Sequence, residues 1–156
     1  MRLVFENLIK VYNDPNDLMA RGHMMSAAAM GAVAFQKGLG AIHALSHPVG
    51  AVYGTHHGTT NAVVMPACLA FNRPAIEEKI EAVAAYLGIK GGFDGFAARV
   101  EELNEMFNFP MGLGAMGVEA DRIPELAAMA IEDPSAGGNP VEMTLENTTA
   151  LFEAAM

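Results

Sequence analysis

Four of the five histidines in this chain, His43, His47, His56 and His57, fall within fifteen residues of one another. Imidazole is the commonest neutral metal ligand in proteins, and it is also the side chain that titrates nearest to neutral pH. His43 and His47 are four residues apart, so a helix would present both on one face. His56 and His57 lie on a glycine-flanked turn that could return another imidazole to that face. The cluster therefore has the composition of a divalent-metal site or a proton-handling site.

The same segment leaves a purely structural role for the histidines open. A catalytic metal ordinarily takes three or four protein ligands, and a hard ion usually takes a carboxylate among them. No Asp or Glu occurs between Asp17 and Glu77, so this segment supplies at best part of a metal site. Glycines near the histidines, such as Gly40, Gly50 and Gly58, suit the close approach of a ligand. They suit helix ends and tight helix packing equally well.

The composition describes one apolar, acidic domain. The 156 residues suffice for a single core, with 52% hydrophobic and 17% charged residues. This apolar excess indicates surface buried against another chain, so we expect a homo-oligomer. A net charge of −9 disfavours nucleic acid and anionic membranes as partners. The single cysteine, Cys68, is expected to be buried and excludes an internal disulfide. We find no targeting or membrane-spanning segment, which together with Cys68 indicates a cytoplasmic protein.

The apolar residues recur mostly at intervals of three and four, and strand signals are nearly absent, which predicts an all-α fold. The second helix is expected to open on Asp14-Pro15 and, with its Ala/Gly-rich middle, to be a buried central helix. Pro48 is expected to break or restart the third helix, and Pro74 to follow the end of the fourth. The predicted bundle has seven to eight helices, near residues 3–12, 14–37, 39–53, 59–71, 75–87, 93–107, 120–131 and 141–155, with loops at 109–117 and 133–140.

Two motifs in register around the histidines resemble a known family. The chain reads Gly40…His43-Ala44…His47…Gly50 and then His57-Gly58…Asn61-Ala62…Pro66. This resembles the signature of the iron-containing (group III) alcohol dehydrogenases, roughly G-x-x-H-A-x-x-H-x-x-G followed by H-G-x-x-N-A-x-x-x-P. The opening and closing helices are also similar to that family. The resemblance thus covers essentially residues 1–156, as the family's dehydroquinate synthase-like helical C-terminal domain.

The resemblance implies a two-domain oxidoreductase. An α/β domain would bind NAD(P), the helical domain would hold Fe²⁺ or Zn²⁺, and the substrate would be a small alcohol or aldehyde. His43 and His57 match two metal ligands of the family, and His47 matches a histidine near nicotinamide and substrate, the candidate catalytic proton relay. Phe35 resembles a cofactor-binding position on the nicotinamide side of the cleft. His56 would be a supporting residue or a spare base.

In the family, the remaining two ligands, an Asp and a His four residues apart, and the nucleotide domain lie upstream of the matched region. If these residues are the whole protein, we expect weak, exchangeable metal binding, no NAD(P) binding and no dehydrogenase activity. Two alternatives stay open. One is a non-catalytic, self-associating helical domain with vestigial histidines. The other is a relative acting on polyols or glycerol, which the motif register favours less.

Overall fold

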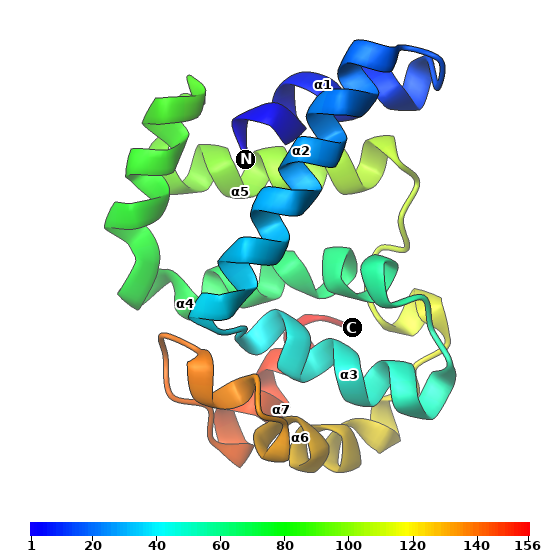
Figure 1. Cartoon of the computed structure of the whole chain (residues 1–156). Coiled ribbons are helices and arrows are strands. Elements are labelled where there is room, and N and C mark those ends of the chain that lie inside the picture. Colours follow the sequence, from blue (N-terminus) through cyan, green and yellow to red (C-terminus); the bar gives the residue numbers. More distant parts are fainter. The chain divides into compact units, whose positions relative to one another are not determined.

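The structure, a computed structural model, describes all 156 residues, and every regular element in it is helical (Figure 1). The all-α prediction and its lower number of helices are confirmed. None of the helices is both long and apolar enough to cross a membrane. The seven α-helices are α1 (Arg2–Asn13), α2 (Leu18–Ala34), α3 (Ala41–Tyr53), α4 (His57–Leu87), α5 (Gly92–Met106), α6 (Ile123–Glu132) and α7 (Leu145–Ala154).

The chain divides into two compact units, residues 1–38 and 39–156. In the first unit α1 and α2 pack against each other. Asp17 caps α2 by accepting a hydrogen bond from the Ala20 backbone nitrogen at 2.9 Å. The helix therefore begins later than the Asp14-Pro15 pair predicts, because Asp17 takes the capping role.

The prediction that α2 is a buried central helix is wrong. Ala20 is its one buried residue. Five of its large apolar side chains are 64% to 80% exposed, namely Leu18, Met19, Met25, Met30 and Val33. At 3.6 residues per turn these side chains fall on one face of the helix, and it is this face that is exposed, while the buried Ala20 lies on the opposite side. Apolar composition alone is a poor predictor of which helix is central.

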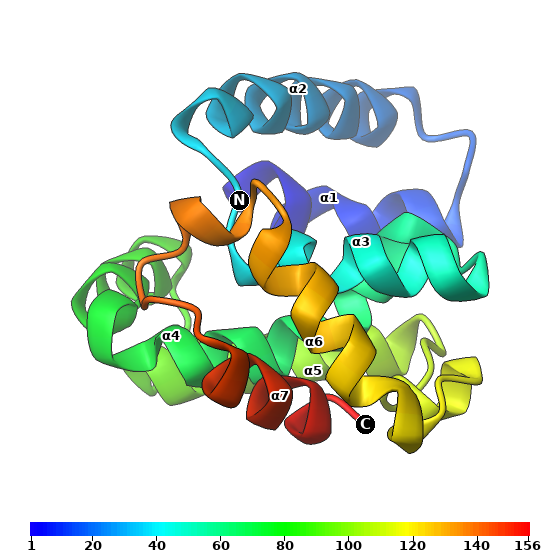
Figure 2. The same ribbon diagram turned by 90° about the horizontal axis from the view of Figure 1, so that it is seen from below.

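The core of the second unit lies where α3, α4, α6 and α7 meet (Figure 2). Its largest fully buried side chains come from elements far apart in the sequence, including Leu45, Leu113, Leu126 and Phe152. Cys68 is buried among them as expected, and burial raises the pKa of its thiol to about 12. This packing fixes α3 against α4 and α6, which matters because α3 carries two of the cluster histidines.

Helix α4 is a single helix of 31 residues, where the sequence predicts two. Pro74 lies inside it, and α4 changes direction along its length (Figure 1), as a proline kink would require. Arg73 bridges this point: it donates to Glu77 at 2.7 Å and to Asp94 of α5 at 2.7 Å. Helix α4 packs along α5 and continues through this proline, which removes one of its backbone hydrogen bonds. Pro48 likewise lies inside α3 without breaking it.

Candidate functional site

A short turn between α3 and α4 brings three histidines together. Helix α3 ends at Gly54, whose φ of 65° is left-handed and favours glycine. Helix α4 begins three residues later at His57. His43 and His47 lie one helical turn apart on α3. The ring centroids are 5.6 Å apart for His43–His47, 5.3 Å for His43–His57 and 5.5 Å for His47–His57. The i,i+4 spacing and the turn place these imidazoles as the sequence predicts.

Asn61, one turn along α4, shows which ring nitrogens converge. Its Nδ2 lies 3.1 Å from Nε2 of His57 and 3.4 Å from Nε2 of His43. Both Nε2 atoms face the Asn61 amide nitrogen, which only donates, so in the tautomer without a hydrogen on Nε2 their lone pairs converge on one point. A metal ion would use these same lone pairs. The Oδ1 atom of Asn61 is buried without a hydrogen-bond partner, which is rare for a buried acceptor.

The electrostatics favour the neutral form of the His43 imidazole. Burial lowers the pKa of His43, and repulsion from His57 and His47 lowers it further, with Asp133 opposing. A metal binds only the unprotonated imidazole, so this shift favours metal binding near neutral pH.

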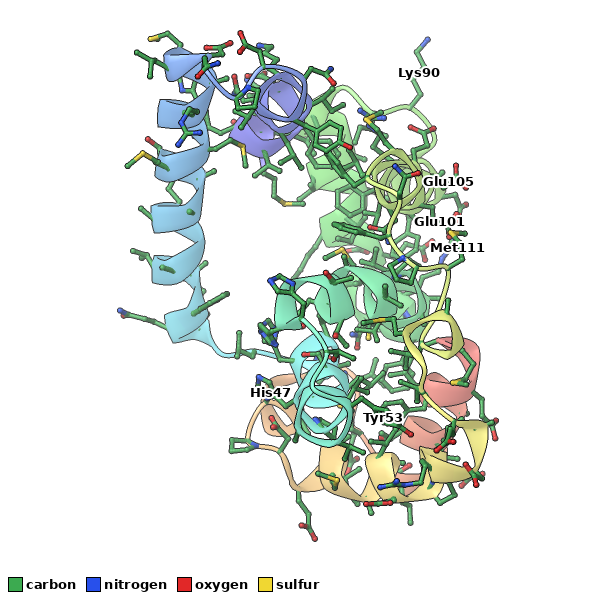
Figure 3. All side chains as sticks on the ribbon, turned by 90° about the vertical axis from the view of Figure 1, so that its right-hand side faces the viewer. His47, Tyr53, Lys90, Glu101, Glu105 and Met111 are labelled. Carbon is green, nitrogen blue, oxygen red and sulfur yellow. The ribbon has the colours of Figure 1, made fainter.

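The structure adds a residue that the sequence analysis missed. Asp133 follows the end of α6, and its Oδ2 lies 2.8 Å from Nδ1 of His47 (labelled in Figure 3). Its Oδ1 accepts from the Ser135 backbone nitrogen at 2.7 Å. Burial raises the pKa of Asp133, but the hydrogen bonds from Ser135 and His47 outweigh it, so the pKa is lowered overall. The sequence does show a carboxylate on an irregular loop, where functional residues often lie. No short-range pattern, however, predicts that residue 133 will contact residue 47.

Two amide side chains attach the Asp133 loop to the histidine helix. Asn139 Oδ1 accepts from the backbone nitrogen of Ala41 and from Nδ2 of Asn72, both at 3.0 Å. Asn139 Nδ2 donates to Asn72 Oδ1 and to the Val141 carbonyl, both at 2.7 Å. We call this pair the Asn72–Asn139 clasp. It links the start of α3, the middle of α4 and the loop after α6.

The two other predicted residues are described separately from the three clustered histidines. His56 caps α4: its Nδ1 accepts from the backbone nitrogen of Thr59 at 3.3 Å. Its observed role is therefore to satisfy the helix N-terminus. Phe35 belongs to the first unit, in the 3₁₀ turn Phe35–Lys37, and exposes 59% of its surface.

The chain's donors fit part of a metal site. No group of three or more His, Cys, Asp or Glu side chains has the geometry to hold a metal ion, and Nδ1 of His47 is already engaged by Asp133. The donors that face one common point are the Nε2 atoms of His43 and His57, both beside the Asn61 amide. They are suitable donors for Fe²⁺ or Zn²⁺ and make up half of a four-ligand set.

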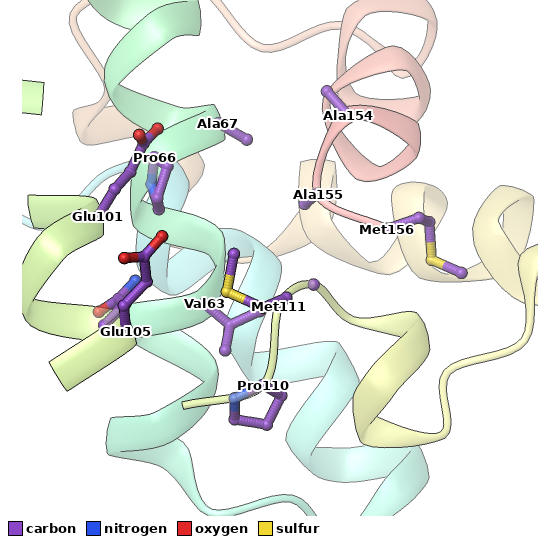
Figure 4. A pocket seen from close by; sticks show the side chains of 12 residues that line it. Val63, Pro66, Ala67, Glu101, Glu105, Pro110, Met111, Ala154, Ala155 and Met156 are labelled. Atoms are coloured by element: carbon purple, nitrogen blue, oxygen red, sulfur yellow. The ribbon is translucent and has the colours of Figure 1, made fainter. Parts of the chain in front are cut away.

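A separate pocket of about 230 Å³ lies between α4, α5 and the C-terminal residues (Figure 4). Its lining includes Val63 and Pro66 of α4, Glu101 and Glu105 of α5, and Met156. None of the clustered histidines lines it. The pocket is therefore distinct from the histidine site.

Comparison with known proteins identifies the family. The model for the Fe-containing alcohol dehydrogenase family, C-terminal, matches residues 1–156. The chain is 38% identical to 4-hydroxybutyrate dehydrogenase of Cupriavidus necator over 152 residues, which cover 92% of this chain and 40% of the relative. It is 36% identical to NAD-dependent methanol dehydrogenase of Bacillus methanolicus over 164 residues, covering 100% of this chain and 43% of the relative.

The fold agrees with these relatives. The solved structure of a 1,3-propanediol oxidoreductase superposes with a TM-score of 0.94 at 30% identity, covering 99% of this chain and 43% of that one. The chain thus spans about two fifths of the length of the relatives it matches. It belongs to the iron-containing alcohol dehydrogenase family, of which it is the helical C-terminal domain.

Proposed function

We propose that this chain supplies two metal ligands, His43 and His57, and a proton-handling histidine, His47, to an NAD(P)-dependent alcohol dehydrogenase site. The observation that carries the proposal is the approach of Asn61 Nδ2 to both Nε2 atoms, at 3.1 and 3.4 Å. A donor that close to two imidazole nitrogens occupies the kind of position that a cation would take. The lowered pKa of His43 supports the same assignment.

Each residue has a separate task in this proposal. A bound Fe²⁺ or Zn²⁺ supplies a Lewis acid that polarises the substrate oxygen. His43 and His57 hold the ion as neutral donors, and α3 and α4 fix their separation. His47 is four residues from His43 and carries the proton to or from the substrate oxygen. Phe35 is proposed to contact the nicotinamide.

The substrate class follows from the relatives' names. They include methanol, lactaldehyde and 1,3-propanediol enzymes, so we propose a short alcohol or its aldehyde as substrate. Two ligands without a carboxylate leave the ion weakly held, so the 156 residues alone bind metal exchangeably and do not oxidise alcohols. The cytoplasm, where thiols stay reduced, is the proposed compartment.

Metal titration tests this proposal directly. The 156-residue chain is titrated with Co²⁺ or Zn²⁺ and followed by absorption and calorimetry. We expect one weak site that His43→Ala and His57→Ala each abolish. His23→Ala is the matched control, because His23 is exposed on α2, away from the cluster in sequence. Equal metal binding by His43→Ala, His57→Ala and the native chain would contradict the ligand assignment, and NAD⁺-dependent alcohol oxidation by these 156 residues alone would contradict their proposed inactivity.

The exposed apolar residues of α2 favour a second candidate, a self-associating helical domain. Leu18 and Met25 expose 80% and 74% of their surfaces, and such side chains commonly mark an interaction surface when they are grouped. Sedimentation velocity over a range of protein concentrations decides the matter. A concentration-dependent dimer that Leu18→Glu dissociates supports homo-oligomerisation through α2, and a strict monomer contradicts it.

A further inference from the structure

We propose that Asp133 is a positioning residue that fixes the tautomer and orientation of His47. By accepting the Nδ1 hydrogen it leaves Nε2 as the nitrogen with the free lone pair. The inference rests on the proposed function, because it assigns His47 the proton-handling role. It adds a residue from the far end of the chain to that role.

The contact between His47 and Asp133 has the geometry of a strong hydrogen bond. Nδ1 of His47 and Oδ2 of Asp133 are 2.8 Å apart, a typical distance for a charge-assisted bond. The Asp133 side chain is only 15% exposed, whereas that of His47 is 40% exposed. The carboxylate is thus the more buried partner, and the imidazole is the partner that solvent and substrate can reach.

The two oxygens of Asp133 have different partners. Oδ1 closes a local turn by accepting from the Ser135 backbone nitrogen at 2.7 Å. Oδ2 reaches across to α3, 86 residues away in sequence. One carboxylate thus joins its own loop to the histidine helix.

A carboxylate dictates the tautomer because it can only accept. The facing Nδ1 must therefore carry the hydrogen, and in the neutral ring Nε2 is then the acceptor. The loop that presents Asp133 is itself held to α3 by the Asn72–Asn139 clasp. Both partners are thus held on packed elements, which is what a defined orientation requires.

The test is Asp133→Asn in the 156-residue chain. The Asn side chain keeps Oδ1 for the Ser135 nitrogen and presents an NH₂ group to His47, so Nδ1 must become the acceptor. Long-range ¹H–¹⁵N NMR at about pH 9, above the ordinary imidazole range, reports the tautomer. We expect the Nδ1–H form in the native chain and the Nε2–H form in Asp133→Asn. Glu132→Gln, which removes the neighbouring exposed charge, should leave the tautomer unchanged.

A second readout measures the chemistry of His47. Acylation by diethylpyrocarbonate needs a free imidazole lone pair, and mass spectrometry locates the product. We expect Asp133→Asn to slow acylation of His47 several-fold and to leave His23 unaffected. The same tautomer and the same acylation rate in both proteins would overturn the inference. Neither readout uses metal or NAD(P), so the Co²⁺ titration of His43 and His57 can fail or succeed separately.

Discussion

Replacing Asn139 with Ala tests whether the Asn72–Asn139 clasp holds the Asp133 loop to the histidine helix. The change removes four hydrogen bonds, to Ala41, to Val141 and two to Asn72. Asn72 is only 8% exposed, so its amide then has neither a donor nor an acceptor. The backbone nitrogen of Ala41, at the start of α3, also loses its partner.

The magnitude follows from these orphaned groups. A buried polar group left unsatisfied costs about 1–3 kcal/mol. With the Asn72 amide as the main loss and the Ala41 nitrogen as a smaller one, we expect Asn139→Ala to lower the free energy of unfolding by about 3–4 kcal/mol. A domain of this size is commonly stable by about 5–15 kcal/mol, so the variant should fold with a clearly reduced urea midpoint.

Urea denaturation followed by circular dichroism measures the loss, and a double-mutant cycle assigns it. Asn72→Ala/Asn139→Ala leaves no amide unpaired at position 72, so it should be no less stable than Asn139→Ala alone. The control is Asn16→Ala, because Asn16 is exposed and contributes only its backbone nitrogen to a hydrogen bond. A loss below about 1 kcal/mol for Asn139→Ala, or strictly additive losses in the cycle, would refute the clasp.

Two further predictions concern close packing and pH. Gly95→Ala would drive its Cβ into the carbonyl of Lys90, so we expect about 1–3 kcal/mol lower stability. Gly137→Ala, whose Cβ meets nothing within 4 Å, is the control, and equal melting temperatures would contradict the reasoning. The lowered pKa of His43 means that the unfolded chain binds its proton more readily than the folded one. Stability should therefore fall as the pH drops below the ordinary imidazole value, and urea midpoints against pH should fall less steeply for His43→Gln.

The parts that the sequence predicted are those governed by short-range geometry. His43 and His47 share a helix face because of their spacing, and a left-handed Gly54 lets the chain reverse before His57. The amphipathic helix near residues 93–107 appears as α5, Gly92–Met106, since its apolar stripe is local. Each of these features is decided within about two helical turns.

The parts that the sequence mispredicted depend on contacts that local rules do not contain. The sequence predicts a helix end at Pro74, yet α4 continues through it and packs along α5. The Ala-rich composition of α2 predicts a buried central helix, yet five of its large apolar side chains are exposed. Tertiary packing outweighed local propensity in the first case, and in the second an apolar helix face was taken for a buried one.

Asp133 shows why a sequence can predict some residues of a site and miss others. The clustered imidazoles come from one helix turn and the loop that follows it, so a short sequence motif is enough to predict them. The carboxylate that faces His47 arrives from 86 residues away, and its arrival depends on Asn139, which bonds to residues 98 and 67 positions distant. Asn139 does no chemistry, but it is the side chain that joins the loop to both histidine-bearing helices. Under our proposal for Asp133, the orientation of His47 therefore depends partly on Asn139, which has no hydrogen bond to it in the structure.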